Sequence, residues 1–214
     1  MYKLKFFITV LLVTLVFGGG SAYADLKGTL DKELSSLIKS TEPYLVTVRG
    51  DGNRRNLVAT GIVYNNEGYV ITSSPAYFAD HFKVTFANGE SYEAEPVGVD
   101  HETGLAVLKI KGNRQFESPP WGTASSLKEG DWVLFVGNSY DNPSSVNIGT
   151  FSGIDDDGLL ELGLNVKPGS SGGAVLNTDG KVIGILVAIE FNRNPILAGW
   201  QKGLYLDDLS LKGR

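Results

Sequence analysis

Short runs of β-branched and aromatic residues, each followed by turn residues, are the feature that most restricts the fold of this sequence. Such runs predict strands, because a helix would need longer segments with an apolar period near 3.6 residues. Two sets of short strands predict an all-β fold, either two packed antiparallel barrels or a sandwich. The first set occupies 44–49, 57–64, 69–72, 82–86, 91–99 and 105–110, and the second 132–136, 146–154, 159–164, 174–176, 181–189 and 203–206.

Turn and linker residues place the boundaries within this β-rich region. Asn88-Gly89 predicts a tight hairpin, because the turn that joins two strands most compactly needs residues that accept positive φ. Pro119-Pro120 begins a linker that reaches about Gly130 and separates the two sets of strands. We therefore expect one domain over 25–206 with two barrels, at about 41–118 and 130–206, and a C-terminal tail over 207–214.

A short helix is predicted before the first strand. Apolar residues recur there at helical spacing and lie on one face. Pro43 follows, and a proline does not continue a helix. The recurring residues are Leu26, Leu30, Leu34, Leu37 and Ile38.

The first 24 residues have the organisation of a secretory signal peptide. Lys3 and Lys5 form a positive start, an apolar run over 6–17 follows, and Ala22-Tyr23-Ala24 places small residues where a signal peptidase reads them. The run has 12 residues, whereas a membrane-spanning helix needs roughly 20. We therefore predict cleavage after Ala24, no stable membrane span after cleavage, and a periplasmic or secreted chain of 190 residues.

Composition excludes several classes of function. Lys and Arg number 19 against 24 acidic residues, which gives a net charge of −5 without any basic tract. A nucleic-acid partner is therefore not expected. Because the chain has no Cys, it has no disulfide, no thiol nucleophile and no Cys-ligated metal site. We expect no cofactor, and the sequence does not indicate an oligomeric state.

The most specific segment is a loop that reads Pro168-Gly169-Ser170-Ser171-Gly172-Gly173. Glycines allow the backbone conformations in which consecutive N–H groups point at one spot. Such a nest is how an oxyanion hole is built, and here it would involve Gly169, Ser170 and Ser171. The other interpretation is a glycine-rich turn that is needed only for folding.

The sequence resembles the HtrA (Deg) family of trypsin-like serine proteases from about Leu37 to Leu206, and the matching segments occur in the family's order. The resemblance implies the double β-barrel fold of that family. It also implies that Ser171 occupies the position of the nucleophile. The matching segments are 60–63, 68–72, 97–100, 105–110, 136–138, 149–154 and 168–173.

The other two members of the family's catalytic triad are missing from their expected positions. Where the family reads Thr-Asn-x-His-Val, this chain reads Thr72-Ser73-Ser74-Pro75-Ala76, so Pro75 replaces the general base. In the segment that bears the family's Asp, Gly104 replaces the carboxylate. A Ser hydroxyl needs a neighbouring base to become a useful nucleophile, and proline offers none.

Only eight residues follow Leu206, whereas the PDZ domain that many family members carry would need roughly 90. We therefore expect this sequence to lack a PDZ domain.

Three other side chains are candidate replacements for the base. His81 and His101 are the two histidines of the chain, and we expect both to be solvated surface residues. A metal site formed by them with Asp100 lacks the usual ligand spacing. Lys167, which precedes the proline of the loop, is expected to be exposed.

These observations predict a pseudoprotease that binds or scaffolds a protein or peptide whose identity the sequence does not give. One alternative is an active serine endopeptidase that uses Ser171 with a non-standard base. Another is a metal-binding or structural domain of the cell envelope. A nitrogen base within about 3.5 Å of the Ser171 hydroxyl would distinguish the active enzyme from the other two.

Overall fold

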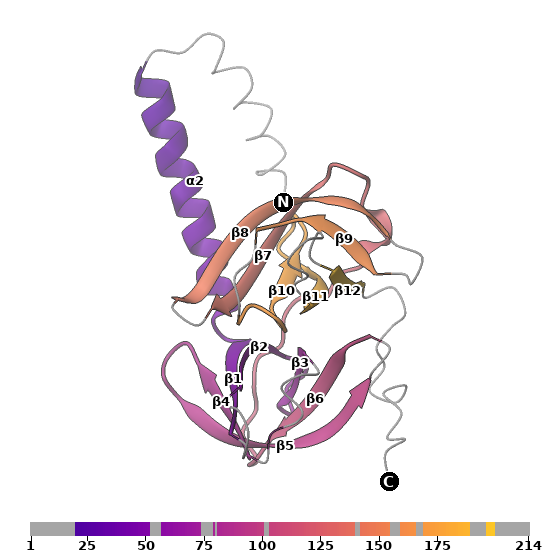
Figure 1. Ribbon diagram of the computed structural model, residues 1–214. Helices are drawn as coiled ribbons and strands as arrows, with labels where there is room; N and C mark the ends of the chain where they lie inside the picture. Colours follow the sequence, from indigo (N-terminus) through magenta and orange to yellow (C-terminus); the bar gives the residue numbers. More distant parts are fainter. Residues whose placement is uncertain are drawn as a thin grey trace. The chain divides into compact units, whose positions relative to one another are not determined.

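The computed structural model describes residues 20–51, 57–73, 79, 81–100, 103–139, 142–154, 159–165, 169–188 and 196–199. The chain divides into two compact units, Met1–Ser40 and Thr41–Arg214. The strands all belong to the second unit, and they are drawn in Figure 1 from purple to yellow in chain order.

Helix α2 (Gly20–Thr41) contains the amphipathic segment predicted from sequence and begins earlier than that segment. It runs through Ala22-Tyr23-Ala24, the predicted cleavage site, whereas residues 1–19 of the predicted signal peptide lie outside the described residues. Lys39 stands in its last turn, where a positive charge interacts favourably with the helix dipole. Among the described residues, no helix is both long and apolar enough to span a bilayer.

The first barrel consists of six antiparallel strands in the order β1-β2-β3-β6-β5-β4, and β4 pairs back to β1 to close it. Its inward positions are apolar and fully buried, as at Val48, Ile62, Val84 and Leu108. The predicted Asn88-Gly89 turn joins β4 and β5, and Gly89 has φ +87. The strands are β1 (Leu45–Asp51), β2 (Leu57–Val63), β3 (Tyr69–Ser73), β4 (His81–Phe86), β5 (Ser91–Asp100) and β6 (Leu105–Ile110).

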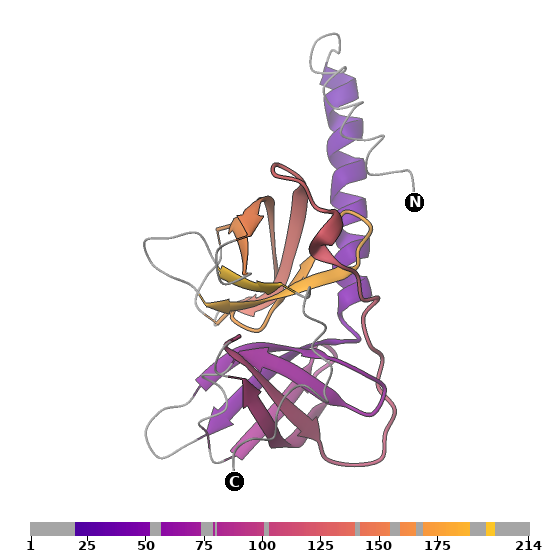
Figure 2. The same ribbon diagram turned by 90° about the vertical axis from the view of Figure 1, so that its right-hand side faces the viewer.

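The second barrel repeats this architecture in the order β10-β11-β12-β9-β8-β7, closed by pairing of β10 with β7. Its core contains Phe135, Leu160, Val175 and Ile183. Figure 2 shows the strands of each barrel curving around their own interior. The strands are β7 (Trp132–Ser139), β8 (Asn142–Ile154), β9 (Leu160–Gly163), β10 (Ala174–Leu176), β11 (Val182–Ala188) and β12 (Ile196–Gly199), with one 3₁₀ turn, η2 (Ala124–Ser126), before them.

The structure confirms the all-β double barrel and most of the expected strands. Among the described residues, the second barrel also contains β12, which the sequence analysis did not predict. That strand is short and has one β-branched residue, Ile196, so its pattern is weak. The strand expected over 203–206 lies outside the described residues.

Buried polar groups join the two barrels where β2 and β7 meet. Thr60, on β2, is fully buried and donates its N–H to the carbonyl of Ser171 at 2.8 Å. Its hydroxyl accepts the N–H of Asn138 at 2.8 Å and lies 3.1 Å and 3.2 Å from the carbonyl oxygens of Asn138 and Gly169. A hydroxyl has one proton, so these two carbonyls share it. One threonine thus binds both a strand and a loop of the second barrel.

Gly172 makes the closest approach at this contact. Its φ is +87, and a Cβ atom added there would lie 1.9 Å from the carbonyl oxygen of Thr60. Its N–H donates to Leu186 on β11 at 2.6 Å. Only glycine therefore allows the loop before β10 to pack against β2.

We expect Gly172→Ala to lower the free energy of unfolding by about 3 to 5 kcal/mol, because the backbone of β2 or of the loop must move. Gly130→Ala is the matched control, since Gly130 also has φ +87 but an added Cβ would meet nothing within 4 Å. It should cost only the left-handed strain, about 1 to 2 kcal/mol. Denaturant unfolding measures both losses, and equal losses would contradict this account of the contact.

Candidate functional site

The loop over 169–173 precedes β10, and its shape is set by backbone bonds within the two barrels. Gly169 and Gly172 both have positive φ, at +88 and +87. The N–H of Gly173 donates to the carbonyl of Ser170 at 2.9 Å, and the carbonyl of Gly173 accepts from Leu186 at 2.9 Å. These bonds fix the loop on β11 at one side, and Thr60 fixes it at the other.

Three consecutive backbone N–H groups of this loop take no part in the bonds just described. Within the part of the chain that the structure describes, the N–H groups of Gly169, Ser170 and Ser171 donate to no acceptor. Gly169 and Ser170 are buried, and Ser171 is half-buried. Buried N–H groups are nearly always paired in folded proteins, so these donors are suited to an acceptor that enters from outside. Gly169, the first of the three, has a positive φ, and successive backbone donors in such a turn can form an anion-receptive nest.

The two serines of the loop also carry hydroxyls without partners. Ser170 is 1% exposed, and its Oγ has no hydrogen-bond partner among the residues that the structure describes. The hydroxyl of Ser171 has none among the described residues, whereas its carbonyl is held by Thr60. Leaving a buried hydroxyl unpaired costs about 1 to 3 kcal/mol, so a ligand that supplies an acceptor to Ser170 would recover part of that cost.

The residues that precede the expected base, and the expected position of the carboxylate, lie next to the loop's supports. Thr72 and Ser73 end β3 in the buried region, and the Thr72 hydroxyl donates to the Thr60 carbonyl at 2.6 Å. Pro75 lies outside the described residues. Gly104 precedes β6 with φ +70, and a Cβ added to it would make an ordinary contact of 3.6 Å with Val187 on β11. That position therefore has room for a side chain, at the cost of left-handed strain.

Of the candidate replacements for the base, only His81 lies within the described residues. His81 begins β4, is exposed, and pairs in register with Asp51 on β1. His101 and Lys167 lie outside the described residues. Asp100 accepts a hydrogen bond from Thr103 at 2.8 Å, which holds the turn before Gly104. The described residues contain no group of three side chains that could together hold a metal ion.

Sequence reasoning missed the residue that positions the loop. Thr60 was considered only as part of a matching segment, because its hydrogen-bond partners in the second barrel lie 78 to 111 positions away in the sequence. One signal in the sequence could have identified it. Thr60 is a polar residue among the apolar and small residues of β2, a strand that is buried on both faces. Such a polar residue must find hydrogen-bond partners.

Comparison with known proteins agrees with this geometry. The model of the family described as Trypsin-like peptidase domain matches residues 59–185, which is more than half of the chain. The chain is 31% identical to "Serine endoprotease DegS" of Haemophilus influenzae over 71% of its own length and 48% of that protein. It is 32% identical to "Probable periplasmic serine endoprotease DegP-like" of Chlamydia muridarum, over 61% of its own length and 28% of that protein.

A third relative is "Putative serine protease HhoA" of Synechocystis, 33% identical over 61% of this chain and 36% of that protein. The chain thus spans between about a quarter and a half of the length of these three relatives. Their names agree with the Deg resemblance read from the motifs, and the matched range includes Thr60, Gly104 and the loop over 169–173. By fold and by sequence, this chain belongs to the trypsin-like peptidase domain family.

Proposed function

We propose that this chain is an HtrA-type pseudoprotease of the periplasm or the secreted fraction, which holds a protein or peptide at the loop over 169–173 without cleaving it. The observation that carries the proposal is the contrast between the loop and its surroundings. The loop keeps its donors, whereas the positions of the base and the carboxylate hold Pro75 and Gly104.

The expected loss of hydrolysis follows from proton chemistry. Attack by Ser171 on a carbonyl requires a group that takes the hydroxyl proton as the bond forms, and a positioned side chain normally does so. Proline has no acceptor on its side chain, and glycine supplies no carboxylate to orient a base. In a serine protease of this kind of mechanism, loss of the base lowers turnover by roughly a factor of a million.

Binding needs none of these groups. A ligand carbonyl or carboxylate that enters the loop would accept from the N–H groups of Gly169 and Ser171, while the hydroxyls of Ser170 and Ser171 donate beside it. The proton of Ser171 stays on its oxygen throughout. Because the loop is held in shape by Thr60 and Leu186, little conformational entropy is lost when the ligand binds.

The purely structural interpretation of the glycines applies to part of the loop only. Gly172 is required by its approach to Thr60, and Gly173 bonds to Leu186, so both serve folding. The N–H groups of Gly169, Ser170 and Ser171 make no bond within the described residues that folding would need. The carbonyls of these three residues accept from Thr60 and Gly173 and so hold the loop, whereas their N–H groups support the proposal of a ligand.

The first prediction of this proposal is an absence of hydrolysis. The purified chain should cleave unfolded protein and an activated ester no faster than its Ser171→Ala variant, because no base activates the hydroxyl. Assays of both substrates at neutral pH make this comparison. Turnover that disappears in Ser171→Ala would show instead that the chain is an active serine endopeptidase, as its relatives are named.

The second prediction concerns restoration of the triad. Pro75→His with Gly104→Asp should produce ester hydrolysis that depends on Ser171. Pro75→His with Gly104→Asn is the matched control, because Asn has the size of Asp and tolerates the left-handed φ of +70 equally well. Without the negative charge, turnover should be about a thousandfold to ten-thousandfold lower. Equal rates from the two folded variants would contradict the assignment of Gly104 to the carboxylate position.

The third prediction tests binding at the loop. A partner is first captured from the native cell envelope on immobilised protein, and its affinity is then measured for Ser171→Ala and for Ser171→Leu. The alanine variant should bind within about tenfold of the parent, because it loses one hydroxyl. The leucine side chain should reduce binding by more than a hundredfold, because it fills the space in front of the donors. Unchanged binding by a stable Ser171→Leu variant would place the partner elsewhere.

A further inference from the structure

A hollow of about 300 Å³ lies on the first barrel, outside the loop discussed above. It is lined by the turn before β1, the hairpin between β4 and β5, and the segment that follows β6. The residues that matter for its chemistry are Glu42, Phe86, Glu90, Arg114, Phe116 and Glu117. Its volume is at the lower end of the range for binding pockets and would hold one long side chain.

Aromatic rings form the apolar part of this hollow. Phe86 and Phe116 are stacked with ring centres 5.7 Å apart and planes 7° apart. Tyr92 stands edge-on to both of them, at 5.8 Å and 5.6 Å. Phe116 is buried, whereas Phe86 is half-buried and retains some exposed surface. The rings are therefore fixed by their mutual packing and do not depend on a ligand.

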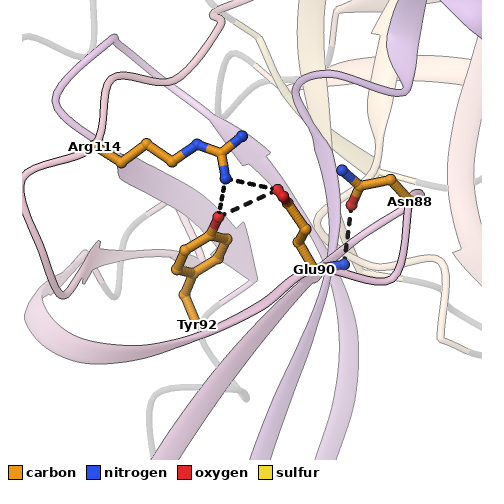
Figure 3. Close-up of polar contacts among 4 residues, drawn as sticks. All are labelled: Asn88, Glu90, Tyr92 and Arg114. Carbon is orange, nitrogen blue, oxygen red and sulfur yellow. Dashed lines mark hydrogen bonds and ion pairs between the residues drawn. The ribbon is translucent and has the colours of Figure 1, made fainter.

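The cation of the hollow is already engaged, as Figure 3 shows. Arg114 pairs with Glu90 at 2.8 Å and hydrogen-bonds the Tyr92 hydroxyl, and its guanidinium lies 5.8 Å from the centre of the Tyr92 ring. The hydrogen bond from Arg114 is the main reason that the pKa of Glu90 lies below its usual value. Glu90 therefore remains ionised at neutral pH, and the pair is neutral overall.

Two carboxylates of the hollow remain uncompensated. Glu42 and Glu117 are exposed, and neither has an ion-pair partner among the residues that the structure describes. With Arg114 and Glu90 cancelling each other, these two give the lining a net charge of about −2. No three carboxylates come together as a metal ion would require, within the described ranges. The charge therefore suits an organic cation better than a metal ion.

We propose that this hollow binds an arginine side chain of a partner protein or peptide. The guanidinium would pair with Glu42 and Glu117, and its aliphatic stem would lie against Phe86. Arg114 demonstrates the same recognition within the chain, because it combines a carboxylate and an aromatic face around one guanidinium. Arginine suits this combination better than lysine, since its planar group stacks on rings and forks toward carboxylates.

The test uses the purified chain and two blocked tripeptides, acetyl-Gly-Arg-Gly-amide and its citrulline counterpart. Citrulline has the shape of arginine without the positive charge, so any difference reports the guanidinium. In an NMR titration at low salt, the arginine peptide should cause saturable shifts of the amides near Glu42, Phe86 and Glu117 at millimolar concentration. The citrulline peptide should bind at least about fivefold more weakly.

Two charge-matched double variants separate the hollow from general attraction to an acidic protein. Glu42→Gln with Glu117→Gln should weaken the arginine peptide by about two- to fivefold for each carboxylate. Glu93→Gln with Glu95→Gln removes the same charge from the pair that binds Lys111 outside the hollow, and should leave affinity unchanged. No saturable shift up to about 10 mM, equal binding of citrulline, or equal weakening by the two double variants would overturn the proposal. Because the hollow is separate from the loop, these outcomes do not depend on whether the chain is a protease.

Discussion

The contact between Thr60 and the loop of the second barrel is the constraint on which the rest of the site depends. It combines a backbone bond from Thr60 to Ser171, a hydroxyl that serves Gly169 and Asn138, and an approach that only glycine permits at position 172. Thr60 is fully buried, so each lost partner would leave a polar group without water to replace it, at about 1 to 3 kcal/mol. The relative position of a strand from one barrel and a loop from the other is thus fixed without any catalytic side chain.

In the proposed pseudoprotease, this independence lets the loop keep its form while the triad is incomplete. In the described residues, every bond that shapes the loop joins backbone groups to one another or to Thr60. A change at the positions of Pro75 or Gly104 removes groups that act on a substrate proton, but it removes none of these bonds. Conversely, a change at Thr60 or Gly172 would alter the loop even if all three members of a triad were present. The shape of the loop and the proton chemistry of a triad therefore depend on different residues of this domain.

The sequence predicted those features that local patterns determine. Apolar runs that alternate with turn residues predicted the strands of both barrels, except the last. The Asn88-Gly89 pair predicted the hairpin, because this turn needs the positive φ that Gly89 adopts. β12 was missed because a strand of four residues depends on pairing with β9 and β11 more than on its own composition. The role of Thr60 and the hollow beside Phe86 were missed for a related reason. Each depends on residues that are distant in sequence, and no local period brings Glu42 near Glu117 or Thr60 near Ser171.

The two proposed sites offer opposite chemistry to a partner. The loop over 169–173 presents hydrogen-bond donors and suits a carbonyl or carboxylate, whereas the hollow presents carboxylates and suits a guanidinium. Peptides contain both kinds of group, so a single partner chain has what each site needs. Two weak contacts on one chain gain affinity because binding at the first makes the second intramolecular, with an effective concentration that a short flexible connection raises to about the millimolar range. Under these two proposals neither the exposed carboxylates of the hollow nor the donors of the loop need to bind tightly alone, because one partner chain would contact both.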